Sequence, residues 1–368
     1  MGHHDDIVID ANHSRADKMV LEQLCRDISA TKEGEDASAS SKTTLETLKA
    51  LNNPQDARFE PTVFTTWDMD DIRSSPRVPG FLLRLLEEYI TWGRTVARNE
   101  TDVVMVTHLL LYFCTSIPSA IILFTRFSYL HAFGHIAMQF YYMGPYTLLK
   151  HQHIHQRGVL AKRFGAIDNL FPYAMDLFMG HTWNSYFYHH VKHHHVEGNG
   201  PDDMSSTIRY QRDSVVDFSI YIGRFLFFVW VDLPRYFLTK GKYVLGAKAA
   251  FWELGAYAFY YSMFQINSRA ASFVFLVPLC VMRIAMMVGN WGQHAFVDAD
   301  EPDSDYRSSI TVIDVPVRFP LLDFYLGLLF LQNVTPADMS NSPLLEQPIL
   351  LQRRVPYLAP PQPDAALA

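Results

Sequence analysis

Four long apolar runs constrain the fold of this chain more than any other feature. They cover residues 103–124, 127–149, 249–266 and 270–291. Each run is close to the roughly 20 residues that a helix needs to cross the hydrocarbon core of a membrane. Only Thr125 and Arg126 separate the first pair, and the short segment NSRA separates the second. A soluble bundle is possible, but paired runs with such short polar turns favour two helical hairpins in a membrane.

A fifth apolar run, 216–238, carries charged residues along its length, among them Asp217, Arg224 and Asp232. Because charges at the centre of a bilayer are costly, we interpret this run as an amphipathic segment at the membrane interface. The chain then crosses the membrane four times, and every histidine-rich segment falls on one side. The sequence thus predicts an all-α membrane protein with four transmembrane helices arranged as two hairpins, interfacial amphipathic helices and a cytosolic histidine-rich cap.

The distribution of charge sets the orientation of that cap. Lysine and arginine gather on the histidine-rich side, whereas the opposite turns hold only Arg126 and Arg269. By the positive-inside rule the histidine clusters are cytosolic. The net charge of -7 gives no support to a nucleic-acid partner. With three widely spaced cysteines the chain has neither a disulfide framework nor a thiolate cluster, so a metal has to be held by nitrogen or oxygen.

The first histidine cluster follows directly on the second apolar run, in the segment KHQHIHQRG. His151 and His155 are four residues apart, so on a continuing helix they share one face and can bind the same metal. His153 points away from that face and is a weaker candidate.

The second cluster lies in YHHVKHHHVEGNGPDD, residues 188–203. His190, His193 and His194 have the spacing of one helical face. His189 and His195 flank that face, and we expect them to lie beside the ligands or on the surface.

The third element, GNWGQHAFVD, ends the fourth apolar run with Asn290 and His294, again four residues apart. Imidazole ligands suit iron, zinc or copper. Six strong candidates exceed what one tetrahedral zinc needs, so the pattern favours a pair of metals.

Other histidines and charges are expected to be structural. His131 and His135 lie at the opposite end of the second run, about 25 Å from the first cluster at about 1.5 Å per residue, and His181 is left undecided. Glu253 and Arg283 interrupt apolar runs and are expected to face the interior as a structural pair. His3, His4 and His13 lie in a polar N-terminal region and are expected to be solvated.

Taken together, HQHIH, HHVKHH and NWGQH around two membrane hairpins resemble the integral-membrane fatty acid desaturase and hydroxylase superfamily. The resemblance covers about residues 80–316, and the stretch VEGNGPDDMSSTIRYQRD resembles a branch found in fungi and algae. We therefore divide the chain into a polar, largely disordered region at 1–78, a desaturase-like membrane domain at 79–316, and a tail outside the family at 317–368. The N-terminus lacks the pattern of a cleaved secretory signal.

The resemblance implies a non-haem di-iron enzyme that uses O2 and two electrons to introduce a double bond into a fatty acyl chain. By this resemblance, the iron ligands would be His151, His155, His190, His193, His194 and His294. Asn290 would hold a water at the metal. The substrate would be a membrane lipid or an acyl-CoA, and the protein would supply an apolar tunnel for its chain. Electrons would come from a separate donor such as cytochrome b5 or a ferredoxin, and the location would be the endoplasmic reticulum membrane.

The sequence departs from the family pattern after its third element. Members of the family carry a further HxxHH box beyond the NxxxH element, whereas residues 295–368 contain no histidine. Val317 and Arg318 can be encoded by GTAAGN, the consensus start of an intron, so we hypothesise that the tail derives from a retained intron or a shifted frame. Three alternatives to a desaturase stay open: a di-iron hydroxylase, a catalytically impaired or regulatory desaturase-like protein, and, with less support, a metal transporter.

Overall fold

The structure is a computed structural model. It describes residues 42–65, 69–211 and 214–294, together with short N-terminal stretches at 3–4, 7–9, 18–19, 21–23, 25–26, 29–30 and 38–41. The tail at 317–368 lies outside the described residues, and so does the segment in which the family pattern would place its last HxxHH box.

The chain forms two compact units. Unit 1 contains the described parts of residues 1–50, 194–225 and 286–294, and unit 2 contains residues 51–193 and 226–285. Each unit is described by itself. The three histidine clusters divide between them, because the first cluster and the start of the second belong to unit 2, and the rest belongs to unit 1.

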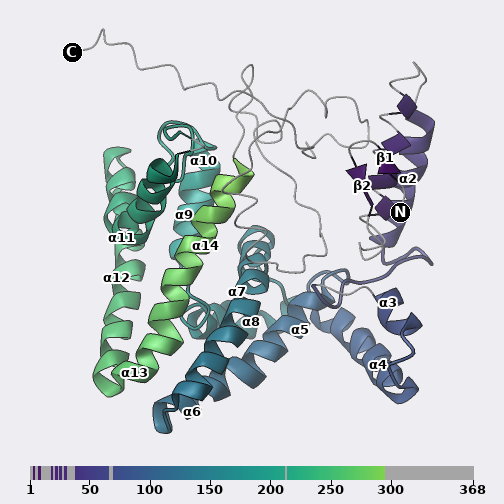
Figure 1. Cartoon of the computed structure of the whole chain (residues 1–368), viewed down its shortest axis with the longest axis horizontal. Coiled ribbons are helices and arrows are strands. Elements are labelled where there is room, and N and C mark those ends of the chain that lie inside the picture. Colours follow the sequence, from purple (N-terminus) through teal and green to yellow (C-terminus); the bar gives the residue numbers. More distant parts are fainter. Residues whose placement is uncertain are drawn as a thin grey trace. The chain divides into compact units, whose positions relative to one another are not determined.

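The centre of unit 2 is the first predicted hairpin. Its first arm is continuous and consists of α5 (Val103–Leu111), the π-helix η1 (Tyr112–Ser116) and α6 (Ile117–Thr125). The second arm is α7 (Tyr129–Gln156), which packs antiparallel to the first (Figure 1). As predicted, the turn is very short, and α7 continues well past its apolar part into the first histidine cluster.

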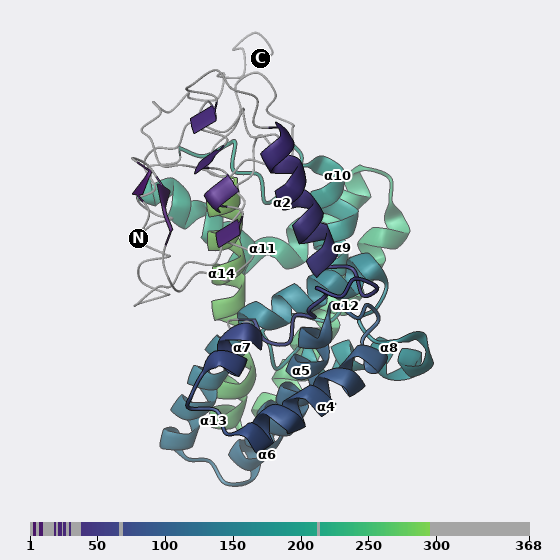
Figure 2. The ribbon, with the colours of Figure 1, turned by 90° about the vertical axis from the view of Figure 1, so that its right-hand side faces the viewer.

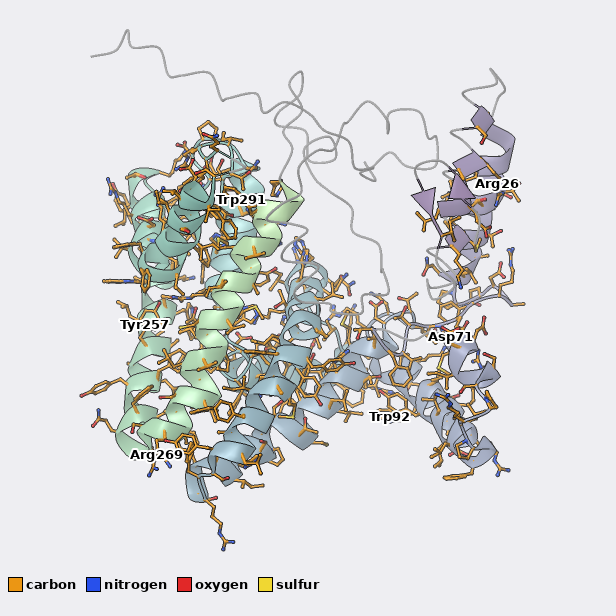
Figure 3. All side chains as sticks on the ribbon, in the orientation of Figure 1. Arg26, Asp71, Trp92, Tyr257, Arg269 and Trp291 are labelled. Atoms are coloured by element: carbon orange, nitrogen blue, oxygen red, sulfur yellow. The ribbon has the colours of Figure 1, made fainter. Side chains whose placement is uncertain are left out.

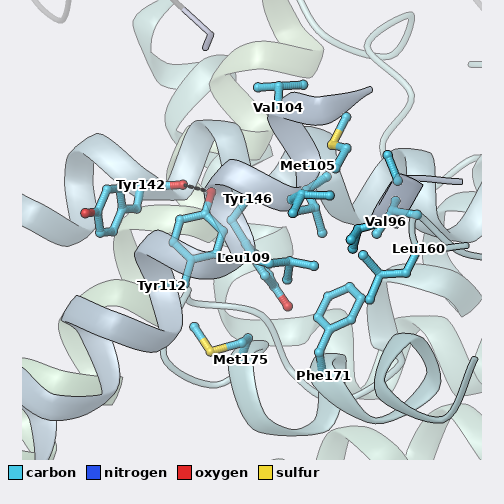
Figure 4. Packing of buried hydrophobic residues seen from close by; sticks show 14 of the residues in the cluster. Val96, Val104, Met105, Leu109, Tyr112, Tyr142, Tyr146, Leu160, Phe171 and Met175 are labelled. Atoms are coloured by element: carbon cyan, nitrogen blue, oxygen red, sulfur yellow. Dashed lines mark hydrogen bonds between the residues drawn. The ribbon is translucent and has the colours of Figure 1, made fainter. Parts of the chain in front are cut away.

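Aromatic side chains hold the two arms of the hairpin together. The ring of Tyr112 on η1 lies edge-on to the rings of Tyr142 and Tyr146 on α7, with centroid distances of 5.1 Å and 5.5 Å. These residues form part of a buried apolar cluster that also includes Leu109 and Met175 (Figure 4). Three large buried rings at one level fix the register between the arms, and the register in turn fixes the height of the histidines that end α7.

Unit 2 has several further elements besides this hairpin (Figure 2). They are α3 (Met69–Ser74), α4 (Gly80–Val96), η2 (Lys162–Phe164), α8 (Gly165–Met175), α9 (Ser185–His189), α12 (Tyr243–Ile266), α13 (Ser268–Ala271) and η4 (Ser272–Leu276). Three elements pass from one unit to the other: η3 (His190–His194), α11 (Val215–Thr239) and α14 (Val277–Gln293). Elements that begin in unit 1 are β1 (His3–His4), β2 (Ile7–Val8), α2 (Ser38–Leu51) and α10 (His195–Glu197). Thus α2 and α3 lie within the region that the sequence predicts to be largely disordered.

Two helical segments among the described residues are long and apolar enough to cross a membrane: Val103–Thr125 and Ser268–Gly292. They correspond to the first and fourth predicted spans. The helices at the second and third predicted spans, α7 and α12, are long enough but more polar, because α7 includes buried His135 and Gln139, and α12 includes buried Glu253. The coarser prediction of a mostly helical protein with membrane-compatible helices is confirmed.

The two charges inside apolar runs form the expected pair. The guanidinium of Arg283 on α14 donates to the carboxylate of Glu253 on α12, and both side chains are buried. The same carboxylate accepts hydrogen bonds from Thr182, Ser185 and Tyr257, the last at 2.6 Å. The carboxylate is thus fully used in internal contacts, which is the arrangement of a structural ion pair.

The predicted interfacial segment is one continuous helix, α11. Its buried side chains recur every three or four residues, at Tyr221, Phe225, Val229, Leu233 and Tyr236. The opposite face exposes apolar side chains, including Phe227, Phe228 and Trp230. One packed face and one exposed apolar face suit a helix that lies against an apolar solvent.

Candidate metal centre

The end of α7 presents two imidazoles on one helical face. His151 and His155 are four residues apart on the last two turns, and their ring centroids are 4.5 Å apart. The helix continues through Gln156, so the geometry predicted for this pair is confirmed.

A third imidazole comes from η3. The Nε2 atoms of His190 and His151 are 3.3 Å apart, and the ring centroids of His190 and His155 are 5.5 Å apart. The ligand nitrogens of these three histidines all lie within 4.8 Å of one another. Two nitrogens that bind one tetrahedral metal at about 2.0–2.1 Å would be about 3.3–3.4 Å apart, so the closest pair has the spacing that shared coordination requires.

Tyr186 fixes the orientation of His190. Their rings stack, with a centroid distance of 5.0 Å and an interplanar angle of 10°. Tyr186 is largely buried, and burial raises the pKa of its phenol to about 12, so it stays neutral at physiological pH. A stacked neutral ring restricts rotation of the imidazole without competing for its ligand nitrogens.

The helix that carries the second cluster differs from the α-helix assumed from its spacing. Residues His190–His194 form a π-helix, in which hydrogen bonds join residues five apart. His195 begins α10 in unit 1, and its place beside the ligands or on the surface stays a prediction.

His193 has a different environment from His190. Its side chain is fully buried, and its ring meets that of Tyr236 edge-on at 4.3 Å. The ring of His189, also buried, lies 5.5 Å away.

The turn after α7 is built around a buried carboxylate. Asp168 on α8 accepts hydrogen bonds from the backbone N–H groups of Val159 and Leu160, and the guanidinium of Arg98 lies 3.4 Å from its other oxygen. Gly158 has φ of +125°, and an added Cβ would lie 2.0 Å from Asp168 Oδ2. Only glycine fits there, so these residues fix where α7 stops and where His155 projects.

His153 belongs to this turn and lies apart from the imidazole cluster. Its Nε2 donates to the carbonyl of Asp168 at 2.9 Å, and its ring packs edge-on against Phe171. Burial, with the nearby charge of Lys150, lowers the pKa of His153 below its usual value, so the ring is neutral. The structure thus separates His153 from His151 and His155, as the spacing predicts.

Unit 1 holds the remaining candidate ligands. His194 Nδ1 lies 2.6 Å from Asp203 Oδ2, and the ring centroids of His194 and His294 are 5.8 Å apart. Asp203 is fully buried and accepts further hydrogen bonds from the backbone N–H groups of Asn199 and Ser205. A carboxylate on Nδ1 fixes the imidazole orientation and directs Nε2 outward, which is the usual arrangement behind a metal-binding histidine. The sequence reasoning did not single out Asp203, although it lies in the segment GNGPDD.

Asn290 and His294 occupy successive turns at the end of α14, and the backbone N–H of His294 donates to the carbonyl of Asn290 at 3.0 Å. The amide nitrogen of Asn290 donates to the carbonyl of Ser205 and to the hydroxyl of Tyr221, at 2.9 Å and 2.7 Å. Thr207 donates to the carbonyl of His294 at 3.0 Å. These contacts tie the loop after the second cluster to the third element within unit 1.

His181 is not a ligand candidate in this structure. It is buried, and its Nε2 lies 3.2 Å from the hydroxyl of Thr147. Burial lowers its pKa to about 4. The contact with Thr147 inside unit 2 is the one expected of a structural residue.

No family model, no curated protein and no solved structure matches this chain. Its description therefore rests on its own geometry. Over the described residues it is a largely helical protein with helices long and apolar enough for a membrane, and with a cluster of imidazoles that can hold a metal ion.

Proposed function

We propose that this chain is a membrane-bound oxidoreductase of the fatty acid desaturase type, which uses O2 and iron to introduce a double bond into an acyl chain. The observation that carries the proposal is the convergence of His151, His155 and His190, which come from two separate helical segments. Three imidazole nitrogen donors suit iron, zinc or copper, and the resemblance of the sequence motifs to that family favours iron.

The residues around the histidines fit a bound metal. In unit 2, Tyr186 orients His190, and the turn built on Asp168 positions the end of α7. In unit 1, Asp203 orients His194, beside which His294 lies. We propose that each of these two groups contributes ligands to a bound iron ion. When bound, the iron would supply the oxidising power that removal of hydrogens from a methylene pair requires.

The exposed apolar surface supports a membrane location. On α4, Phe81, Leu85 and Trp92 are exposed, as are Phe251 and Tyr261 on α12. Exposed apolar patches of this extent suit contact with lipid better than contact with water. We propose four membrane spans, with α4 and α11 at the interface, histidines on the cytosolic side of the endoplasmic reticulum membrane, a lipid or acyl-CoA substrate, and a separate electron-donor protein.

Metal loading of the purified full-length chain tests the site. The protein in detergent is incubated anaerobically with Fe(II), desalted and analysed for iron. We expect bound iron in the wild type and at least about a tenfold loss of affinity in His151→Ala and His155→Ala. The matched control is His153→Gln, on the same turns but directed toward Asp168, which should keep its iron. Equal loss in all three variants, or no iron in the wild type, would refute the site.

Lipid analysis tests the reaction separately. Because residues 295–368 contain no histidine, we expect the chain as it stands to bind less than two irons and to leave the lipids of an expression host nearly unchanged. Appending a segment with an HxxHH box should produce new unsaturated acyl chains, whereas hydroxylated products would identify a hydroxylase. A fully loaded extended chain with no lipid product would reject the enzyme and leave a metal-binding membrane protein.

A further inference from the structure

A polar cluster lies inside the α5–α7 hairpin, away from the histidine-rich end of α7. It consists of Ser116, Ser119, His131, His135 and Gln139, and we refer to it as the hairpin cluster. His135, Gln139 and Ser116 have at most 1% of their surface exposed. Along α7, Gln139 precedes His151 by twelve residues, or about 18 Å at about 1.5 Å per residue. The hairpin cluster is therefore distinct from the candidate metal centre.

Three hydrogen bonds connect four of its five members in a consistent direction. Gln139 Nε2 lies 3.3 Å from His135 Nε2, and His135 Nδ1 lies 2.9 Å from Ser119 Oγ. Ser119 Oγ also lies 2.9 Å from His131 Nε2. If Gln139 donates to His135, then His135 donates to Ser119 and Ser119 donates to His131, so each group finds a partner. Both ring nitrogens of His135 are used, which leaves no donor set for a metal ion.

Two polar atoms of the hairpin cluster have no hydrogen-bond partner among the described residues: Gln139 Oε1 and Ser116 Oγ. Exchanging the amide oxygen and nitrogen of Gln139 would not supply the missing partner, because the amide nitrogen would then occupy the position without one. A buried polar group without a partner costs about 1–3 kcal/mol. Both atoms lie on fully buried side chains, so the cost is not relieved by contact with bulk solvent.

The hydroxyl of Ser116 is unusual for a helix. Many helical hydroxyls among the described residues donate to a carbonyl three or four residues earlier, as Thr95 does to Trp92 and Thr115 does to Leu111. Ser116 ends η1, and in this π-turn the carbonyl of Tyr112 accepts from the backbone N–H of Ile117 instead. The π-turn thus releases the hydroxyl toward the interior, and π-turns of this kind are frequent at functional sites.

The register of the hairpin brings the two atoms to the same level. Ser119 contacts His131 and His135, and one helical turn earlier Thr115 contacts Tyr142. Ser116 lies between these two levels on its arm, as Gln139 does on α7. Ala120, Leu123 and Ala132, which neighbour the cluster along α6 and α7, belong to a buried apolar core.

We infer that the hairpin cluster binds the hydroxyl group of a neutral lipid. Gln139 Oε1 accepts a hydrogen bond from the ligand hydroxyl, and Ser116 Oγ forms a second hydrogen bond with the same hydroxyl group. An uncharged ligand with an apolar body fits, because the site offers no charge and its walls are apolar. A long-chain alcohol or a hydroxylated acyl chain has this chemistry. The inference does not depend on the metal centre.

Binding of tritiated 1-dodecanol to the purified full-length chain in detergent, measured by scintillation proximity, tests the inference. Binding should saturate, and unlabelled 1-dodecanol should compete while dodecane should not. Each lost hydrogen bond should weaken binding by about two- to tenfold. Ser116→Ala removes an unbonded hydroxyl and should fold normally, and the double variant with Gln139→Leu should show the larger loss.

The matched control is the double variant Ser262→Ala with Gln265→Leu, at exposed positions of α12, which should bind as the wild type does. Competition by dodecane equal to that by the alcohol would overturn the inference. So would unchanged binding in the Ser116→Ala and Gln139→Leu double variant, or absence of saturable binding. A hairpin cluster that holds only water would give this last result.

Discussion

The buried pair of Glu253 and Arg283 provides a strong test of the packing in unit 2. Substituting Arg283→Met removes the cation and leaves the carboxylate buried, with only the hydroxyls of Thr182, Ser185 and Tyr257 as donors. Breaking a buried ion pair in this way costs about 3–5 kcal/mol. For a protein of this size about 1 kcal/mol corresponds to roughly 2–4 °C, so we expect the melting temperature to fall by roughly 10 °C.

The assay is thermal unfolding in detergent, followed by circular dichroism. The matched control is Arg269→Met, an exposed arginine at the start of α13 whose guanidinium lies 5.4 Å from the Phe127 ring centroid (Figure 3). Losing that contact costs at most about 1 kcal/mol. Adding Glu253→Gln to Arg283→Met removes the uncompensated charge and should recover about half of the loss. If Arg283→Met behaves like Arg269→Met, or if the second substitution gives no recovery, the pair is not buried as described.

Three further predictions concern the neighbourhood of the histidines. Asp203→Ala should weaken metal binding by about ten- to a hundredfold with little change in helix content, because His194 loses its orienting carboxylate; a Co(II) titration followed by absorbance measures this. Gly158→Ala should lower the melting temperature by several degrees, since a side chain at φ of +125° would meet Asp168; an unchanged value would contradict the turn geometry. His181, outside the proposed spans, has a pKa of about 4 when folded against about 6.5 when unfolded, so the unfolded state takes up its proton first as the pH falls. Stability should therefore decline between about pH 6.5 and pH 4 by up to about 3 kcal/mol, and His181→Gln should flatten this decline in a melting series across pH.

The sequence predicts most of what depends on spacing within a single helix. His151 and His155 share a face because α7 continues through them, and Asn290 and His294 occupy successive turns for the same reason. The pairing of Glu253 with Arg283 could also be predicted, because burying either charge without its partner would cost several kcal/mol of folding free energy, about 3–5 kcal/mol.

Features that depend on contacts between distant segments could not be predicted in the same way. The close approach of His190 to His151 joins residues 39 positions apart, and spacing within one helix contains no information on it. The role of Asp203 depends on a loop that folds back nine residues to His194. An acidic residue in a segment rich in glycine looks like an ordinary turn until that loop is seen.

The predicted second and third spans illustrate a different limit. Hydropathy identifies Val103–Thr125 and Ser268–Gly292, whereas α7 and α12 carry buried polar groups that lower their average. Glu253 is satisfied by partners within unit 2, and both ring nitrogens of His135 have partners in the hairpin cluster, whereas Gln139 keeps one amide atom without a partner there. The average hydropathy of a helix counts a polar side chain in the same way whether it faces lipid or faces an internal partner.

The π-turns show how one additional residue per turn can alter a site without altering the sequence pattern. In η3 the π-turn gives His193 an environment different from that of His190. In η1 it leaves the hydroxyl of Ser116 without its usual carbonyl partner. A π-turn alone does not make a site, because in η4 the hydroxyl of Ser272 still donates to the carbonyl of Ser268. The informative combination is a π-turn together with a displaced polar group, and in unit 2 that combination occurs both at the candidate metal centre and at the hairpin cluster.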